Sequence, residues 1–147
     1  MRRLTIGISA AFAIVFVVAV SGQEKLTFDE HATLMKANAQ AMTAFNSAIE
    51  SAAWPEARLQ VATLRKSFMA MRPFWAERNV AAASGMVRTG LSQLAALEEM
   101  LGRAAAAVPQ AALRDTAKEL TGVCASCHAA YREGTAQSGF KFKAGVF

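Results

Sequence analysis

The sequence is poor in the residues from which disulfide scaffolds and metal centres are built. Its 147 residues include only two cysteines and two histidines, too few for a disulfide-rich scaffold. A zinc site with four ligands would have to add a distant histidine and a carboxylate to the cysteine pair. A thioredoxin-like redox pair requires a strand–helix–strand setting, which this sequence lacks. A structural disulfide between the two cysteines remains an alternative.

The sequence also lacks a cluster of basic residues, although its formal net charge is +5. Arg2 and Arg3 precede an apolar run over residues 4–20 and the small residues Ser21 and Gly22. This pattern is typical of a secretory signal peptide, which we expect over residues 1–22. The run is slightly short for a transmembrane helix of roughly 20 residues, so we expect membrane association only if the signal is not cleaved.

Removal of this signal takes away two arginines and no acidic residue, which lowers the net charge from +5 to +3. Neither a basic cluster nor an RNA-binding motif accompanies the remaining charge. The composition therefore predicts no nucleic-acid partner.

Proline is scarce as well, with three residues in the chain: Pro55, Pro73 and Pro109. Proline lacks an amide donor and disfavours helix at the preceding residue, so each one predicts a helix boundary. Thr27-Phe28-Asp29-Glu30 is a capping box that opens the first helix. We expect helices over residues 28–52, 55–71, 73–106 and 109–133. Four helices with short connections predict an all-α fold, an antiparallel four-helix bundle.

The first expected helix carries one apolar stripe at steps of three and four residues. Its members are Phe28, Ala32, Met35, Ala39, Met42, Phe45 and Ile49. In the third expected helix, a bend or close packing would explain why Gly85 and Gly90 are tolerated. The C-terminal tail, residues 135–147, is expected to be irregular, with Phe140 or Phe142 packed on the bundle.

The fourth expected helix contains the sequence Cys124-Ala125-Ser126-Cys127-His128. At spacings of three and four residues, both thiols and the imidazole project from the same helix face. Cys-x-x-Cys-His is the attachment motif of c-type haem, in which both cysteines form thioethers to the porphyrin and the histidine binds the iron. The motif therefore predicts one covalently bound haem c in the core, with His128 as an iron ligand.

This late motif, followed by Tyr131 and Arg132, combines with the segment Leu34-Met35-Lys36-Ala37-Asn38 in the first helix. With these features the chain resembles the cytochrome c prime superfamily, the class II cytochromes c, and most closely its low-spin c-556-type branch. The resemblance covers essentially the whole mature chain. It implies a haem-binding bundle over residues 23–134, export to the periplasm of a Gram-negative bacterium, and Met35 as the second iron ligand.

Other assignments of these residues remain open. Met35 could be ordinary core packing, and Met42 and His31 are alternative ligands, although we expect His31 to be exposed in the first turn of its helix. Arg132 lies one turn beyond His128, where it could pair with a haem propionate or remain solvated.

The resemblance implies a periplasmic carrier of single electrons that is not an enzyme and that works with redox partner proteins. The alternative within the family is a five-coordinate cytochrome c prime that binds or senses small gases such as NO or CO. A haem-free helical adaptor is a third class. Members of the family often pair through the first two helices, so a homodimer of this kind is a further expectation.

Overall fold

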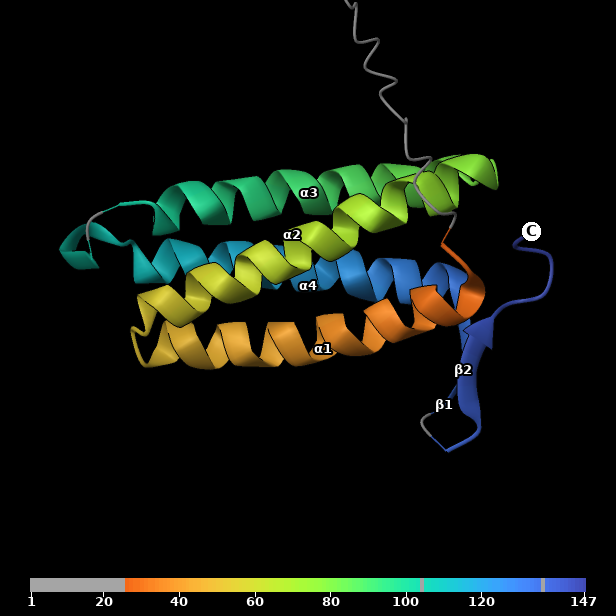
Figure 1. Cartoon of the computed structure of the whole chain (residues 1–147), viewed down its shortest axis with the longest axis horizontal. Coiled ribbons are helices and arrows are strands. Elements are labelled where there is room, and N and C mark those ends of the chain that lie inside the picture. Colours follow the sequence, from red (N-terminus) through yellow and green to blue (C-terminus); the bar gives the residue numbers. More distant parts are fainter. Residues whose placement is uncertain (1–25, 104, 136) are drawn as a thin grey trace, which may run out of the picture.

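The computed structural model describes residues 26–147 apart from 104 and 136, and its main feature is a set of four long helices. They are α1 (Phe28–Glu50), α2 (Trp54–Glu77), α3 (Ala81–Leu101) and α4 (Gln110–Tyr131), with a short 3₁₀ turn, η1 (Ala105–Ala107), before α4. The helices lie side by side and run alternately in opposite directions (Figure 1). The predicted helical bundle is therefore confirmed, while the expected signal at residues 1–22 lies outside the described residues.

The bundle is held together by an apolar core to which all four helices contribute. Its largest fully buried side chains are Trp75, Phe45, Phe74, Ile49, Leu64, Leu94, Leu97, Leu101, Leu113, Leu120 and Val61. Burial of each such side chain stabilises the fold by about 1.5–3 kcal/mol. Within the described part of the chain, no helix is both long enough and apolar enough to cross a membrane.

Helix α1 begins and ends through local hydrogen bonds that the sequence encodes. The predicted capping box is confirmed, because the Thr27 hydroxyl accepts from the Glu30 amide while the Glu30 carboxylate accepts from the Thr27 amide. At the other end, Ala52 takes a left-handed conformation with φ of 52°. The Ala53 amide then donates to the Ala48 carbonyl, the pairing of a Schellman motif.

The boundary predicted at Pro73 is wrong, because Pro73 lies inside α2 and the helix continues to Glu77. Phe74 and Trp75, which follow it directly, are each only 1% exposed, so their packing offsets the missing amide donor. The chain breaks instead at Asn79, whose φ is 58°. There the Val80 amide donates to the Trp75 carbonyl in a second Schellman motif. Trp75 therefore belongs to α2 and not to the third helix.

Close packing explains one of the two glycines of α3. A Cβ atom placed on Gly90 would lie within 2.3 Å of Cε1 of Phe68, a buried residue of α2. At Gly85 the nearest atom would be an Arg88 guanidinium nitrogen at 3.7 Å, an ordinary contact. Gly90 thus lets α2 and α3 approach each other, whereas Gly85 has no such role.

The prediction of an irregular tail is wrong, because the chain forms a β-hairpin directly after α4. Helix α4 ends at Tyr131, and β1 (Arg132–Thr135) pairs antiparallel with β2 (Gly139–Phe142). The Lys143 side chain then donates to the Ala129 carbonyl near the end of α4. The hairpin and the C-terminus lie at the end of the bundle where α1 begins and α4 ends (Figure 1).

Candidate functional site

The two cysteines lie on the face of α4 that packs against the rest of the bundle. This face begins with the buried residues Leu113, Ala117 and Leu120 and continues, at the same spacing, through Cys124, Cys127 and Tyr131. The last three are half-buried and contact the apolar core. The sequence spacing therefore places both thiols on one inward side of α4, as predicted. At this level of the bundle the two side chains are only partly shielded from solvent.

Both thiols are free in the structure and are not joined in a disulfide. Burial raises the pKa of the Cys124 thiol. Burial, together with the neighbouring Cys124, raises the pKa of the Cys127 thiol to about 11. Both groups are consequently protonated thiols at neutral pH, and both sulfur atoms are available to form covalent bonds.

His128 follows on the same side of α4 and is also half-buried. Burial lowers the pKa of its imidazole, and the nearby charge of Arg132 lowers it further. The imidazole is therefore favoured in its neutral form, which is the form that binds metal. Cys124, Cys127 and His128 together present two thiols and one neutral imidazole from the last two turns of the helix.

Arg132 lies just beyond the helix, in extended backbone at the start of β1, and not in a further helical turn as predicted. Its guanidinium lies over the ring of Phe140, 4.1 Å from the ring centre. Among the described residues it forms no ion pair with a carboxylate. The Arg132 charge is thus held near His128 and is free to meet an anionic group.

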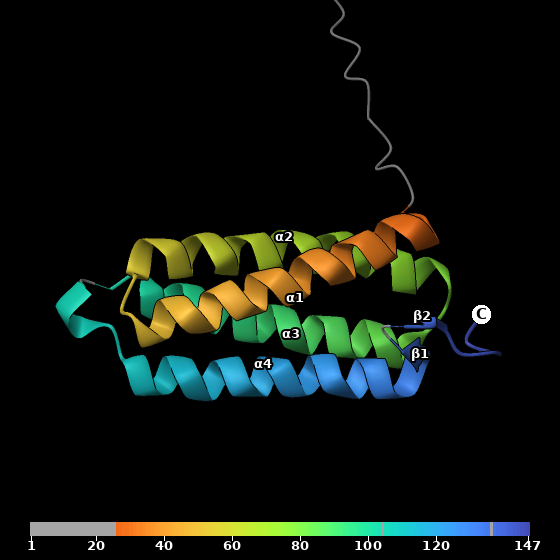
Figure 2. The same cartoon turned by 90° about the horizontal axis from the view of Figure 1, so that it is seen from below.

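Helix α1 lies opposite α4 and runs in the reverse direction. The Arg114 guanidinium of α4 binds the Glu50 carboxylate of α1 through two hydrogen bonds of 2.7 and 2.8 Å. The side chain of Gln110 also donates to the Ile49 carbonyl. Figure 2 shows that the two helices are near each other at this end and diverge toward the end that carries His128.

These contacts fix which residues of α1 lie level with His128. Both helices rise about 1.5 Å per residue. His128 follows Arg114 by 14 residues, and counting 14 back from Glu50 reaches residue 36. In the same way, His128 follows Gln110 by 18 residues, and counting 18 back from Ile49 reaches residue 31. The level of His128 therefore falls between residues 31 and 36 of α1, a window that contains Met35.

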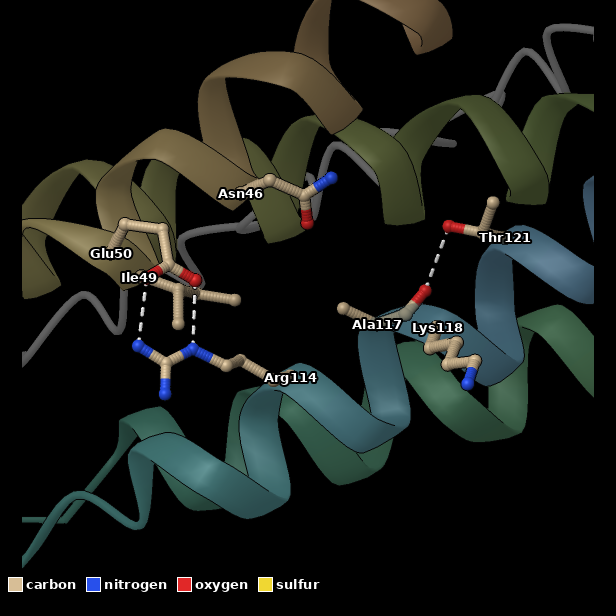
Figure 3. A pocket seen from close by; sticks show the side chains of 7 residues that line it. All are labelled: Asn46, Ile49, Glu50, Arg114, Ala117, Lys118 and Thr121. Carbon is tan, nitrogen blue, oxygen red and sulfur yellow. Dashed lines mark hydrogen bonds and ion pairs between the residues drawn. The ribbon is translucent and has the colours of Figure 1, made fainter.

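A cleft of about 360 Å³ lies between α1 and α4 at the end away from the cysteines. It is lined by Asn46, Ile49, Glu50, Arg114, Ala117, Lys118 and Thr121 (Figure 3). The Glu50–Arg114 ion pair closes one side of it, and Lys118 points along its rim (Figure 3). None of the predicted site residues lines this cleft.

His31 is not exposed, contrary to the prediction. Its side chain is 7% exposed and stacks on Phe74 with ring centres 4.4 Å apart. Its Nε2 atom is buried without a hydrogen-bond partner among the described residues. Burial, followed by the charges of Arg78 and His128, lowers the pKa of His31 to about 4. Both histidines of the chain are therefore favoured as neutral imidazoles.

The burial of His31 depends on a group of aromatic side chains that the sequence analysis did not identify. We call this group the aromatic end cluster: it joins α1, α2, α4 and the tail and consists of Phe28, His31, Phe74, Trp75, Tyr131, Phe142 and Phe147. Phe142 is thus packed on the bundle, whereas Phe140 is 52% exposed. The seven-residue spacing of His31, Asn38 and Phe45, all buried, was the available sequence signal for this face.

The predicted stripe of α1 is correct only in its second half. Phe45 and Ile49 are buried, but Phe28, Ala32 and Ala39 are exposed. Met35 and Met42 are half-buried and contact the core from its edge. The inward face of α1 is rotated toward His31 and Asn38, which leaves the two methionines at the border of the core.

The donor set fits a covalently attached haem better than a bare metal ion. Among the described residues, no three His, Cys, Asp or Glu side chains are grouped as a metal-ion site. The inward side of α4 instead offers two free thiols and a neutral imidazole. Cys124 and Cys127 contact the apolar core, an arrangement that suits a flat apolar ring bound through sulfur and one nitrogen. Cys124, Cys127 and His128 are the residues that would hold it.

Comparisons with protein-family models, with curated proteins and with solved structures found no match.

Proposed function

We propose that the protein is a periplasmic c-type cytochrome that carries single electrons. One haem c is bound through thioethers to Cys124 and Cys127, and its iron is ligated by His128 and Met35. Such a haem supplies a one-electron couple between ferric and ferrous iron. Cys124 and Cys127 would hold the ring, and His128 and Met35 would bind its iron.

The observation that carries this proposal is the register of α1 against α4. The contacts Arg114–Glu50 and Gln110–Ile49 bring the level of His128 between residues 31 and 36 of α1, and Met35 falls within this window. Met35 is half-buried at the border of the core. Met35 therefore has the level along the bundle and the partial burial that a second iron ligand would need.

The divergence of the two helices is a second support. A ring held between an α4 histidine and an α1 methionine needs α1 and α4 to lie farther apart at the motif than along the rest of the bundle. Figure 2 shows this separation at the end carrying His128. At the opposite end, the Glu50–Arg114 ion pair holds the helices together.

The chemistry of the ligands favours electron transfer over substrate activation. With an imidazole and a thioether bound, no coordination position is open, so an electron can be exchanged with little rearrangement and the protein is not an enzyme. A soft, neutral sulfur favours ferrous iron and raises the reduction potential. Arg132, which pairs with no carboxylate among the described residues, would supply a positive charge for a haem propionate.

Spectroscopy of the exported, haem-loaded protein tests this proposal. We expect a mass increase of one haem, low-spin bands in both oxidation states and the charge-transfer absorption of a ferric iron–thioether bond. Met35→Ala should abolish that absorption and lower the reduction potential. Met42→Ala is the matched control, because Met42 is also half-buried on α1, and it should leave the absorption in place.

Two results would contradict the proposal in different ways. A product with no added haem would refute the assignment of a cytochrome altogether. A high-spin wild-type protein that binds CO and is unchanged by Met35→Ala would instead identify a five-coordinate, gas-binding cytochrome.

A further inference from the structure

His31 is a buried imidazole that the proposed function does not use. Its Nε2 atom is enclosed without a polar partner among the described residues. Leaving a buried polar atom unsatisfied costs about 1–3 kcal/mol. Such an atom in a side chain that is 93% buried needs an explanation.

The surroundings of His31 hold it in place without satisfying that nitrogen. Phe74 stacks on its ring at 4.4 Å, Phe142 packs at 5.2 Å, and Trp75 approaches edge-on at 5.7 Å. Aromatic faces and edges orient an imidazole but leave the lone pair of Nε2 unused. The ring is therefore held in place with one nitrogen lone pair unsatisfied.

The position of His31 along α1 matches the level of the haem motif. The Gln110–Ile49 contact puts residue 31 level with His128, and the Arg114–Glu50 contact puts residue 36 there. Between residues 31 and 36, two side chains carry a metal-binding atom and are shielded from solvent: His31 is buried and Met35 is half-buried. They are four residues apart, which places them one turn from each other on neighbouring parts of the same face.

His31 is also favoured in its neutral form, mainly because it is buried. An imidazole that stays neutral at physiological pH loses no proton when it binds a metal. Nitrogen is a harder donor than a thioether sulfur, so it suits the ferric state.

We propose that His31 is a reserve ligand of the haem iron. Its Nε2 atom binds the ferric iron when the Met35 thioether is not bound. This inference rests on the proposed function, since it requires the haem on Cys124 and Cys127. In the exchange, the iron–sulfur bond is lost and an iron–nitrogen bond forms, while the imidazole proton stays on Nδ1 and the iron keeps its oxidation state.

The test compares three haem-loaded variants by ferric absorption and electron paramagnetic resonance. In Met35→Ala we expect a low-spin bis-imidazole spectrum in place of the thioether spectrum. In Met35→Ala with His31→Phe, which keeps an aromatic ring on Phe74, we expect high-spin ferric iron and CO binding after reduction. Met35→Ala with Met42→Ala is the matched control and should remain low-spin, because Met42 is not the replacing ligand.

Each other outcome decides against the inference. High-spin iron in Met35→Ala alone would show that His31 does not reach the iron, while the loss of the thioether band in the same variant would still support the proposed function. A low-spin spectrum that persists without His31 would assign the new ligand to another residue. Met35→Ala with His31→Gln, checked for helix content by circular dichroism, separates these results from a folding defect. A product without covalent haem would overturn both proposals.

Discussion

Gly90→Ala tests the close approach of α2 and α3 quantitatively. A Cβ at this position would lie 2.3 Å from Cε1 and 2.9 Å from Cδ1 of Phe68. Phe68 is 5% exposed, so its ring has no solvent-filled space into which it can turn. Overpacking of this kind costs about 1–3 kcal/mol. The alanine gains about 1 kcal/mol of helix propensity, so we expect the variant to be equally stable or less stable by up to about 2 kcal/mol.

Gly85→Ala is the matched control, since it is in the same helix and its Cβ would make only an ordinary contact. It should gain about 1 kcal/mol of stability. The two variants should therefore differ by about 1–3 kcal/mol. At roughly 4 °C per kcal/mol for a domain of this size, thermal unfolding followed by circular dichroism on the haem-loaded protein will resolve this difference.

A double variant isolates the contact itself. Phe68→Leu removes the ring atoms nearest to Gly90, so Gly90→Ala should be less destabilising in that background than in the wild type. If Gly90→Ala proves as stabilising as Gly85→Ala, or if its effect is the same with and without Phe68, the two helices are not held together by this contact.

Two further predictions concern the backbone and the buried histidine. Ala52→Gly should raise the free energy of unfolding by about 0.5–1 kcal/mol, because the left-handed backbone of Ala52, with φ of 52°, is costly for alanine but not for glycine. Asn79→Gly, at the equivalent position after α2, should raise it by less, because asparagine tolerates this conformation better than alanine does. Equal increases for the two variants in chemical unfolding would contradict this prediction. The folded-state pKa of His31 is about 4, below the unfolded value of 6.5, so the unfolded chain binds more protons between these values and stability should fall as pH is lowered from 6.5 to 4. His31→Phe should remove this part of the pH dependence in urea unfolding measured across that range, and parallel curves for the two proteins would refute it.

Much of the candidate site could be predicted because it is local in sequence. The spacing of Cys124, Cys127 and His128 on one helix already determines that they share a face. The structure confirms that all three lie on α4 and that both cysteines pack against the core. The capping box at Thr27 is equally local. The predictions that failed concern residues whose state depends on distant parts of the chain.

Pro73 and His31 illustrate that dependence. Pro73 stays within α2 because Phe74 and Trp75 pack against aromatic rings of α1 and the tail, a gain that local propensity does not include. His31 is buried because Phe74 comes from α2 and Phe142 comes from the tail. The hairpin was missed because its strands are only four residues each, and Phe142 anchors it to the bundle.

The sequence by itself determined the four-helix architecture and the placement of two thiols and an imidazole on one side of the last helix, because periodicity and spacing act within a few turns. Only the tertiary structure decided which residues of α1 lie level with His128, since that register is set by Arg114 with Glu50 and by Gln110 with Ile49. It also decided that His31 is enclosed, because burial is a property of the neighbours that packing brings together and not of the residue itself.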